Sequence, residues 1–318
     1  MYFIARRLAI SLATLFLVSV MCFLAFSVIR GDPASLILGT GASAEQVAAL
    51  REEMGLDRSL PERYLAWLGN FLAGNLGNSV RFRGESIAGM IRERLPVTFS
   101  LALLSLFFIL ALSFPAALFS VRKEGGFTDR LMNIFTATGI GMPGFFLGVL
   151  FIWIFGISLR FFSPGAYVGY RENFPAFAAY LVFPALAIAL PNAAILVKFL
   201  RTSLFREQRS DYVRTARGKG AGRRFVLYRH VLRNAVIPAL AILGMIVAEV
   251  FSGSIVIEQV FTIPGIGRLL ITSITSRDYP LIQTLVVYIA FVVIAANTLV
   301  DMAIQLVDPR IRLEAEAP

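Results

Sequence analysis

Six long apolar stretches constrain this chain of 318 residues more than any other feature of its sequence. A membrane-spanning helix needs roughly 20 mostly apolar residues to cross about 30 Å of hydrocarbon. The stretches that meet this requirement are Leu8–Ile29, Val97–Val121, Leu131–Leu159, Phe177–Val197, Ala235–Ile257 and Pro280–Val307. Only 16% of the residues are charged, against about 25% in an ordinary soluble domain. The sequence therefore predicts an all-α integral membrane protein with six transmembrane helices, and it excludes a soluble enzyme or a secreted module.

The distribution of Lys and Arg predicts that both termini lie in the cytoplasm. Cytoplasmic loops of membrane proteins carry an excess of these residues, whereas long loops are largely exempt from the rule. With the N-terminus inside, the cytoplasmic segments hold eighteen Lys and Arg and the short outer loops hold four. The net charge of +10 thus reflects orientation in the bilayer, and we expect no binding of nucleic acid.

The segment between the first two spans is predicted to be helical and to lie outside. Ser43 and Gln46 fit a capping box that starts a helix ending at Gly55. A second helix opens at Ser59, and its apolar side is formed by Tyr64, Trp67, Leu68 and Phe71. A third, with Ile87, Met90, Ile91 and Leu95, leads into the second span. These helices can form an outer docking surface or lie on the membrane interface. Residues 1–96 are one predicted region, and 97–318 are a five-helix core.

The third apolar stretch is interrupted by small residues and a proline. Because Pro143 lacks a backbone donor, we expect it to kink this helix. Gly144 and Gly148 form a small-xxx-small pair of the kind that permits close helix contact. The segment therefore either packs tightly against a neighbour or acts as a hinge.

The loop between the fourth and fifth spans, residues 198–234, carries eleven Lys and Arg against Glu207 and Asp211 alone. Asp211 is expected to cap a short helix over residues 212–217. Glycines at 218, 220 and 222 then permit a sharp turn, and a second helix is expected from Arg223 to Pro238. The loop either docks a partner protein or touches anionic headgroups.

A few polar side chains fall within or beside the spans, where such residues usually face the bundle interior or a water-filled path. Glu249 either lines a path that suits a cationic amine or is hydrogen-bonded between helices. Glu258 is either a gate residue or a helix-end charge. Asn297, Asp301 and Gln305 share one face of the last span, and Asp301 either pairs with Arg310 or packs at an interface.

Motifs for independent catalysis are missing from the sequence. Gly218-Lys219 is followed by Gly220 and not by the Ser or Thr of a nucleotide-binding loop. The single histidine, His230, excludes a His-Glu-x-x-His zinc site, and the single cysteine, Cys22, excludes a disulfide framework. An enzyme acting alone is therefore not expected.

The loop sequence is recognisable. Asp211-Tyr212-Val213-Arg214-Thr215-Ala216-Arg217-Gly218-Lys219-Gly220, followed by Arg229-His230-Val231-Leu232-Arg233-Asn234-Ala235-Val236-Ile237-Pro238, resembles the "EAA" cytoplasmic loop of ABC importer permeases. The chain is similar to the B-type permease subunit of the dipeptide/oligopeptide family over nearly its whole length. Further matching motifs are Gly31-Asp32-Pro33, Leu76-Gly77-x-Ser79, Arg94-Leu95-Pro96-x-Thr98, Phe261-x-x-Pro264-Gly265-x-Gly267 and Arg277-Asp278-Tyr279-Pro280.

The resemblance implies a transport subunit without its own ATPase. Two permeases would form the pathway in a bacterial or archaeal inner membrane, two ATPase subunits would bind ATP and Mg, and an extracytoplasmic binding protein would deliver the ligand. This chain would hold no cofactor or metal. The coupling helix that contacts the ATPase would comprise Asp211, Tyr212, Arg214, Thr215, Ala216, Arg217, Gly218, Lys219 and Gly220. From their places in or beside the spans, and not from the resemblance, the candidates for the path or gate are Pro143, Glu249, Glu258, Asn297 and Asp301.

Departures from the family pattern concern substrate detail. Arg30 stands where Pro is usual, Asn75 where Asp is common and Gly218 where Ala is common. Similar permeases import dipeptides, oligopeptides, glutathione, nickel complexes or oligosaccharides. Two alternatives from other classes are an ion-coupled secondary transporter and a membrane scaffold without transport activity.

Overall fold

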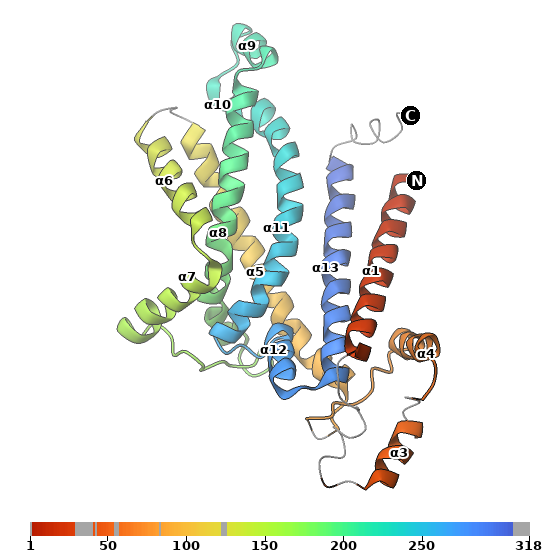
Figure 1. The fold of residues 1–318 in the computed structure, drawn as a ribbon. Coiled ribbons are helices and arrows are strands. Elements are labelled where there is room, and N and C mark those ends of the chain that lie inside the picture. Colours follow the sequence, from red (N-terminus) through yellow and green to blue (C-terminus); the bar gives the residue numbers. More distant parts are fainter. Residues whose placement is uncertain are drawn as a thin grey trace. The chain divides into compact units, whose positions relative to one another are not determined.

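The computed structural model describes residues 2–28, 41, 43–53, 57–82, 84–121 and 126–307. Within these ranges the regular structure is helical, apart from one isolated β-bridge between Asn78 and Ser86. The elements, most of them labelled in Figure 1, are α1 (Tyr2–Val28), α3 (Ala44–Glu53), α4 (Leu60–Leu72), α5 (Ile87–Val121), α6 (Phe127–Gly141), α7 (Gly144–Phe151), the π-helical segment η1 (Ile152–Ser158), α8 (Phe174–Gln208), α9 (Asp211–Gly218), α10 (Arg223–Val226), the π-helical segment η2 (Leu227–Val231), α11 (Leu232–Val260), α12 (Ile266–Ser276) and α13 (Tyr279–Val307).

Five helices of the described chain are each long and apolar enough to cross a membrane. They comprise Ala5–Ser27, Ile87–Val121, Phe174–Gln208, Arg223–Val260 and Tyr279–Gln305. The sixth predicted span is a bent pair, because α6 and the helix from Gly144 to Ser158 meet at an angle of 100°. The described residues thus hold five spans, or six if the pair is counted as one.

The break in the third span lies at Pro143 and is larger than the expected kink. Met142 is extended, with φ −95° and ψ 119°, and Pro143 is the N-cap of α7 and not a residue inside a helix. A proline disfavours the helical conformation of the residue before it, so Met142 leaves the helix. The expectation of one kinked helix is therefore wrong, because the segment forms two separate helices. A hinge at Pro143 stays a prediction.

The second helix of the loop continues well beyond the predicted end at Pro238. α10, η2 and α11 form one helix from Arg223 to Val260, and Pro238 lies inside it. A proline removes one backbone hydrogen bond, but the packing of the flanking turns can hold the helix together. The prediction of an end at Pro238 was wrong for this reason.

Contacts divide the chain into two compact units. The first unit comprises Met1–Arg7, Pro96–Arg268 and Val293–Pro318, and the second comprises Leu8–Leu95 and Leu269–Val292. The sequence suggests a single division at residue 96, whereas these units each combine segments from distant parts of the chain. The division at residue 96 stays a prediction.

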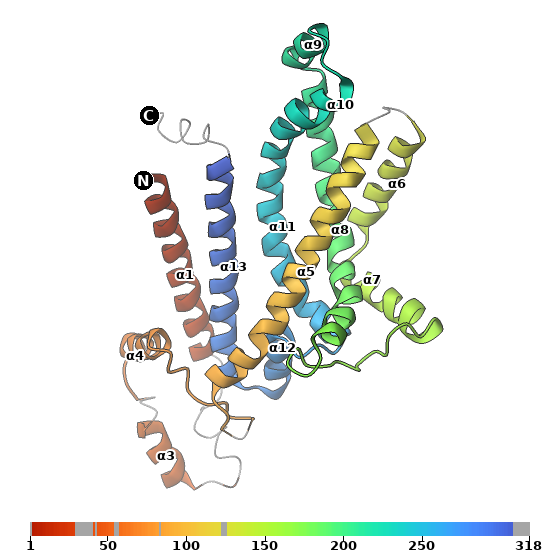
Figure 2. The same ribbon diagram turned by 180° about the vertical axis from the view of Figure 1, so that it is seen from behind.

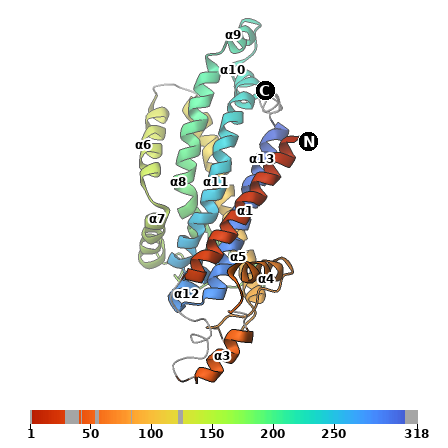
Figure 3. The ribbon, with the colours of Figure 1, turned by 45° about the vertical axis from the view of Figure 1, so that its right-hand side comes forward.

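Within the first unit, α8 is the central helix. It lies beside α11 and along α6 (Figures 1 and 3), and α5 crosses it diagonally in the view of Figure 2. Two glycines let α7 pack closely against its neighbours. A Cβ on Gly144 would lie 3.1 Å from the carbonyl oxygen of Ala187 in α8, and a Cβ on Gly148 would lie 3.1 Å from the Phe261 ring, which follows α11. Close packing through the Gly144–Gly148 pair is therefore what the structure contains.

Within the second unit, α4 packs on α1 through aromatic side chains. The Tyr64 and Phe23 ring centroids are 5.4 Å apart, and the Tyr64 hydroxyl lies 2.8 Å from the Ser19 hydroxyl. The Trp67 ring also lies close to Phe23, tilted by 41° with the ring centroids 6.0 Å apart. The predicted apolar side of α4 is thus partly covered inside this unit, and an outer docking surface stays a prediction.

The predicted helix starts of the outer segment agree with the structure. The Gln46 amide N–H donates to the Ser43 hydroxyl at 3.2 Å, and the Ser43 N–H donates to Gln46 Oε1 at 3.0 Å. At α4, the Ser59 N–H donates to Glu62 Oε2 at 3.1 Å. Gly55, the predicted end of the first helix, lies outside the described residues.

Candidate functional site

The short helix α9 projects beyond the ends of α8 and α11 (Figure 1). Its N-cap is Ser210, with φ −72° and ψ 153°, and not Asp211 as predicted. Asp211 occupies the first turn, where its negative charge suits the helix dipole. It lies 3.6 Å from the Arg214 guanidinium, and its side chain is almost fully exposed. The cap of α9 therefore lies one residue earlier than predicted, because Ser210 adopts the extended conformation that a cap requires.

The end of α9 is a Schellman motif, in which two backbone hydrogen bonds close the last turn. The Gly220 N–H donates to the Arg217 carbonyl at 2.9 Å, and the Ala221 N–H donates to the Ala216 carbonyl at 3.1 Å. Gly220 has φ +86°, a backbone conformation that residues with a side chain rarely adopt. The predicted sharp turn is therefore confirmed at Gly220.

One side of α9 is attached to the rest of the first unit. Val213 is completely buried in the core cluster, and Ala216 packs against this cluster. The Tyr212 hydroxyl lies 2.8 Å from Glu207 Oε2 at the end of α8, and burial raises the pKa of Tyr212 above its ordinary value. A buried side chain and this hydrogen bond thus hold α9 close to the end of α8.

The other side of α9 is open. Arg214, Arg217 and Lys219 are exposed, and a Cβ added to Gly218 or Gly220 would meet no described atom within 4 Å. An exposed helix face with small residues permits the close approach of a partner.

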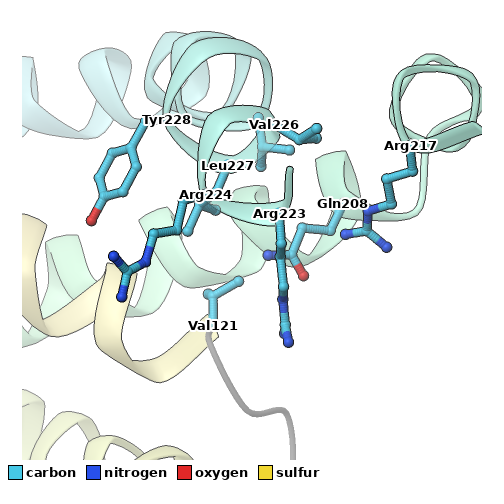
Figure 4. Close-up of a pocket in the computed structure, with 9 residues that line it drawn as sticks. Val121, Gln208, Arg217, Arg223, Arg224, Val226, Leu227 and Tyr228 are labelled. Atoms are coloured by element: carbon cyan, nitrogen blue, oxygen red, sulfur yellow. The ribbon is translucent and has the colours of Figure 1, made fainter. Parts of the chain in front are cut away.

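A basic pocket of about 200 Å³ lies beside α9 (Figure 4). Its charged lining is Arg217 from α9 and Arg223 and Arg224 from the first turn of α10, and none of the described residues that line it is acidic. Figure 4 shows Arg224 and Tyr228 reaching to one side of the pocket and Arg217 on the other. The region around the loop therefore has a strongly positive potential that favours an acidic partner surface.

The far end of the helix that begins at Arg223 carries a different kind of site. Glu258 is completely buried near the end of α11. Its carboxylate accepts a hydrogen bond from the Thr98 hydroxyl of α5 at 2.6 Å and another from the Arg268 N–H of α12 at 3.1 Å. The Thr98 oxygen in turn accepts the Ile266 N–H at 2.9 Å. Glu258 thus joins three helices close to the end of α11, and a role as a gate residue stays a prediction.

Two glycines allow the backbone to approach this carboxylate and α11. A Cβ on Gly265 would lie 2.2 Å from the Glu258 carboxyl carbon, and one on Gly267 would lie 2.4 Å from the Ile255 Cα. Either contact is shorter than real Cβ atoms show. The motif Phe261-x-x-Pro264-Gly265-x-Gly267 is therefore explained by packing around Glu258.

The other predicted path residues do not meet Glu258 in a common site. Glu249 is exposed on α11 and has no hydrogen bond or ion pair within the described chain, so bonding between helices of this chain is not observed. Asn297 is half-buried on α13. Asp301 pairs with Arg7 of α1, and Arg310, its predicted partner, lies outside the described residues. The partner of a carboxylate near a helix end is the cation that the fold brings to it, and the distance in sequence does not reveal that cation.

A buried ion pair in the first unit was missed by sequence reasoning. Arg201 of α8 pairs with Asp129 of α6, and both residues are less than one-tenth exposed. Asp129 also accepts from the Ser120 hydroxyl of α5 at 2.9 Å, and Asn133 accepts from Arg201 at 2.8 Å. The sequence offered one signal of this pair, which is that Asp129 lies just before the third apolar stretch.

A second missed cluster lies in the second unit. Asp278 is completely buried at the start of α13 and accepts hydrogen bonds from the Ser79 hydroxyl and from the Arg81 N–H, the latter at 3.2 Å. It also accepts from the Leu281 N–H at 3.3 Å, as an N-cap does. Ser79 and Asp278 both stand in motifs of the family resemblance, which this contact explains. Over the described part of the chain, no group of three His, Cys, Asp or Glu side chains is placed to hold a metal ion.

Comparisons with known proteins agree over nearly the whole chain. Residues 1–102 match a family model described as the N-terminal part of binding-protein-dependent transport system membrane components, and residues 110–313 match the model of binding-protein-dependent transport system inner membrane components. A probable peptide ABC transporter permease of Sinorhizobium fredii is 35% identical over 310 residues, which cover 98% of this chain and 99% of the relative. The oligopeptide transport system permease AppB of Bacillus subtilis is 32% identical over 311 residues, with 97% and 98% covered.

Proposed function

Because the chain belongs to the family of binding-protein-dependent transport system inner membrane components, we propose that it forms half of the translocation pathway of an ABC importer for peptides or related small solutes. A second homologous permease would form the other half. Two ATPase subunits would bind ATP and Mg, and an extracytoplasmic binding protein would deliver the ligand. Both termini and the loop that holds α9 would face the cytoplasm.

The observation that carries this proposal is the geometry of α9. Its inner side is tied to the core by Val213, whereas Gly218 and the basic residues of its outer side are open. A groove on an ATPase subunit that receives this outer side would push on a helix with few degrees of freedom. Closure of the ATPases on ATP would then move the ends of α8 and α11 as a rigid body.

The far end of the same helix supplies a route from the coupling loop to the outer side. Arg223–Val260 is one helix of 38 residues, and Glu258 near its end is bonded to α5 and α12. Movement of this helix would therefore displace the turn that leads to α12. We assign Glu258 the role of a fixed connection in the outer part of the pathway, and Glu249 remains a candidate for contact with a cationic solute.

Peptides are the proposed substrates because the relatives are named as peptide or oligopeptide permeases. Members of the same family that import nickel complexes, glutathione or oligosaccharides are the nearest alternatives. The binding protein would set most of this specificity. The ligand found in the co-purified binding protein by mass spectrometry would decide among these substrate classes.

The coupling role can be tested with a substitution that leaves this chain undisturbed. Gly218→Trp places a large side chain where the described chain offers open space. If an ATPase groove receives this face, the variant should lose at least about tenfold of binding-protein-stimulated ATPase activity. It should also retain fewer ATPase subunits on purification.

The matched control is Gly69→Trp on α4, where an added Cβ likewise meets nothing within 4 Å. This variant should keep its ATPase subunits and its basal ATPase activity. Unchanged stimulation in Gly218→Trp would refute the assignment of the coupling helix.

An ion-coupled transporter is the main alternative from another class. Vesicles that contain the full complex should take up solute in an ATP-dependent manner that vanadate inhibits and a protonophore does not. Uptake that the protonophore abolishes and vanadate leaves intact would favour the ion-coupled alternative.

A further inference from the structure

A groove of about 340 Å³ lies between α6 and α8, apart from the coupling loop and from the Glu258 cluster. Both helices belong to the first unit, and they run side by side in all three ribbon views (Figures 1, 2 and 3). The groove has two chemically different parts. Its polar lining includes Asn133, Lys198, Arg201 and Thr202, and its apolar lining includes Ala137 and Ile140.

Arg201 places a fixed guanidinium, paired with Asp129, in the wall of the groove. It is only 8% exposed, and its guanidinium is held by Asp129 and by Asn133. Its Nε has no hydrogen-bond acceptor among the described residues. An arginine carries five N–H donors, and a buried donor needs an acceptor, so the Nε of Arg201 favours a further acceptor at this wall.

Lys198 adds a second positive charge on the same side of α8. It lies three residues before Arg201, so the two side chains are neighbours on the helix surface. Lys198 is exposed, and no ion pair involving it is found in the described chain. It directly follows the apolar part of α8, which places its ammonium where hydrocarbon gives way to headgroups.

The apolar part of the groove continues along α6. Ala137 is exposed, and Ile140 is 42% exposed although it lines the groove. A small soluble anion would make no favourable apolar contact with Ala137 and Ile140. An amphipathic ligand with an anionic group at one end and a hydrocarbon chain at the other would cover both parts.

We propose that this groove binds an anionic phospholipid, with the phosphate at Lys198 and Arg201 and an acyl chain along Ala137 and Ile140. The assignment uses only the orientation proposed above, in which this end of α8 faces the cytoplasm. Anionic lipids of the inner leaflet are attracted to basic pockets between transmembrane helices on that side. The lipid would bridge α6 and α8 next to the buried Arg201–Asp129 pair.

The test is native mass spectrometry of the full transport complex, titrated separately with phosphatidylglycerol and phosphatidylcholine. The wild-type chain should retain phosphatidylglycerol preferentially. Lys198→Gln should weaken this binding about fivefold, because one Lys near an anionic headgroup contributes on the order of 1 kcal/mol. Ala137→Trp should also weaken it, since it fills the apolar part of the groove without changing the charge.

Arg130→Gln is the matched control, because it removes an exposed cation from the first turn of α6 outside the groove lining. It should change binding less than twofold. Equal losses in Arg130→Gln and Lys198→Gln would mean diffuse attraction and would overturn the proposal, as would equal retention of phosphatidylcholine. Displacement of phosphatidylglycerol by inorganic phosphate would assign the site to soluble anions instead. Lipid binding is read without ATPase activity, so a negative result here leaves the proposed function untouched.

Discussion

The helix from Arg223 to Val260 ends in two regions that use glycine in opposite ways. Before its start, Gly218 and Gly220 of the coupling loop have no described atom near the position of a Cβ. Beyond its end, Gly265 and Gly267 are so closely packed that a Cβ would overlap Glu258 or Ile255. Gly218 and Gly220 thus leave space beside α9 into which another chain could fit, whereas Gly265 and Gly267 are required by contacts inside this chain.

The largest effect is expected at the closed end. Gly265→Ala should destabilise the first unit by about 3 kcal/mol or more, because its Cβ would displace a buried carboxylate. Thermal unfolding of the purified complex in detergent measures this change. Gly253→Ala on α11 is the matched control, since its Cβ meets nothing within 4 Å. Equal stability of the two variants would break the comparison.

The next effect concerns the hydrogen bonds of Glu258. Thr98→Val removes both the hydroxyl that donates to Glu258 and the oxygen that accepts the Ile266 N–H. Each buried group left without a partner should cost about 1–3 kcal/mol. Thr98→Ser keeps the hydroxyl and should stay close to the wild type in the same unfolding experiment. A Thr98→Val protein as stable as the wild type would show that Glu258 does not hold this turn together.

A smaller effect is expected at the open end, where only backbone conformation is at stake. Gly220→Ala should cost about 1–2 kcal/mol, because its φ of +86° is unfavourable for a residue with a Cβ. Gly220→Asn should be tolerated better, since Asn adopts this region more readily. Circular dichroism during thermal unfolding compares the two variants. Identical curves for Ala and Asn would indicate that the turn is not required for stability.

The smallest effect is predicted for the exposed pair on α9. Asp211→Asn removes the charge that faces Arg214, yet it should change stability by less than about 0.5 kcal/mol, because exposed ion pairs contribute little. Any loss of ATPase stimulation in this stable variant would therefore reflect the partner subunit. A clear loss of stability would instead assign Asp211 a structural role in this chain.

Much of the candidate site could be predicted, because its signals are local. The turn at Gly220 follows from the spacing of glycines after a short amphipathic helix, and its backbone geometry agrees. The cap at Asp211 was misplaced by one residue, since Ser210 is an equally good cap and only the path of α8 decides between them. Glu258 was recognised as notable, but its role depends on Thr98, which is 160 residues away in sequence.

The long apolar helices, the capping boxes between the first two spans and the basic loop of residues 198–234 could be predicted from the amino-acid sequence alone. These features arise from side chains that act on their own helix or on the surrounding solvent, so periodicity and composition reveal them. The tertiary structure alone decided the angle at Pro143, the burial of Glu258 and the pairing of Asp129 with Arg201 and of Asp301 with Arg7. A buried charge has to find its partner in the folded chain, and that partner is chosen by packing between distant segments.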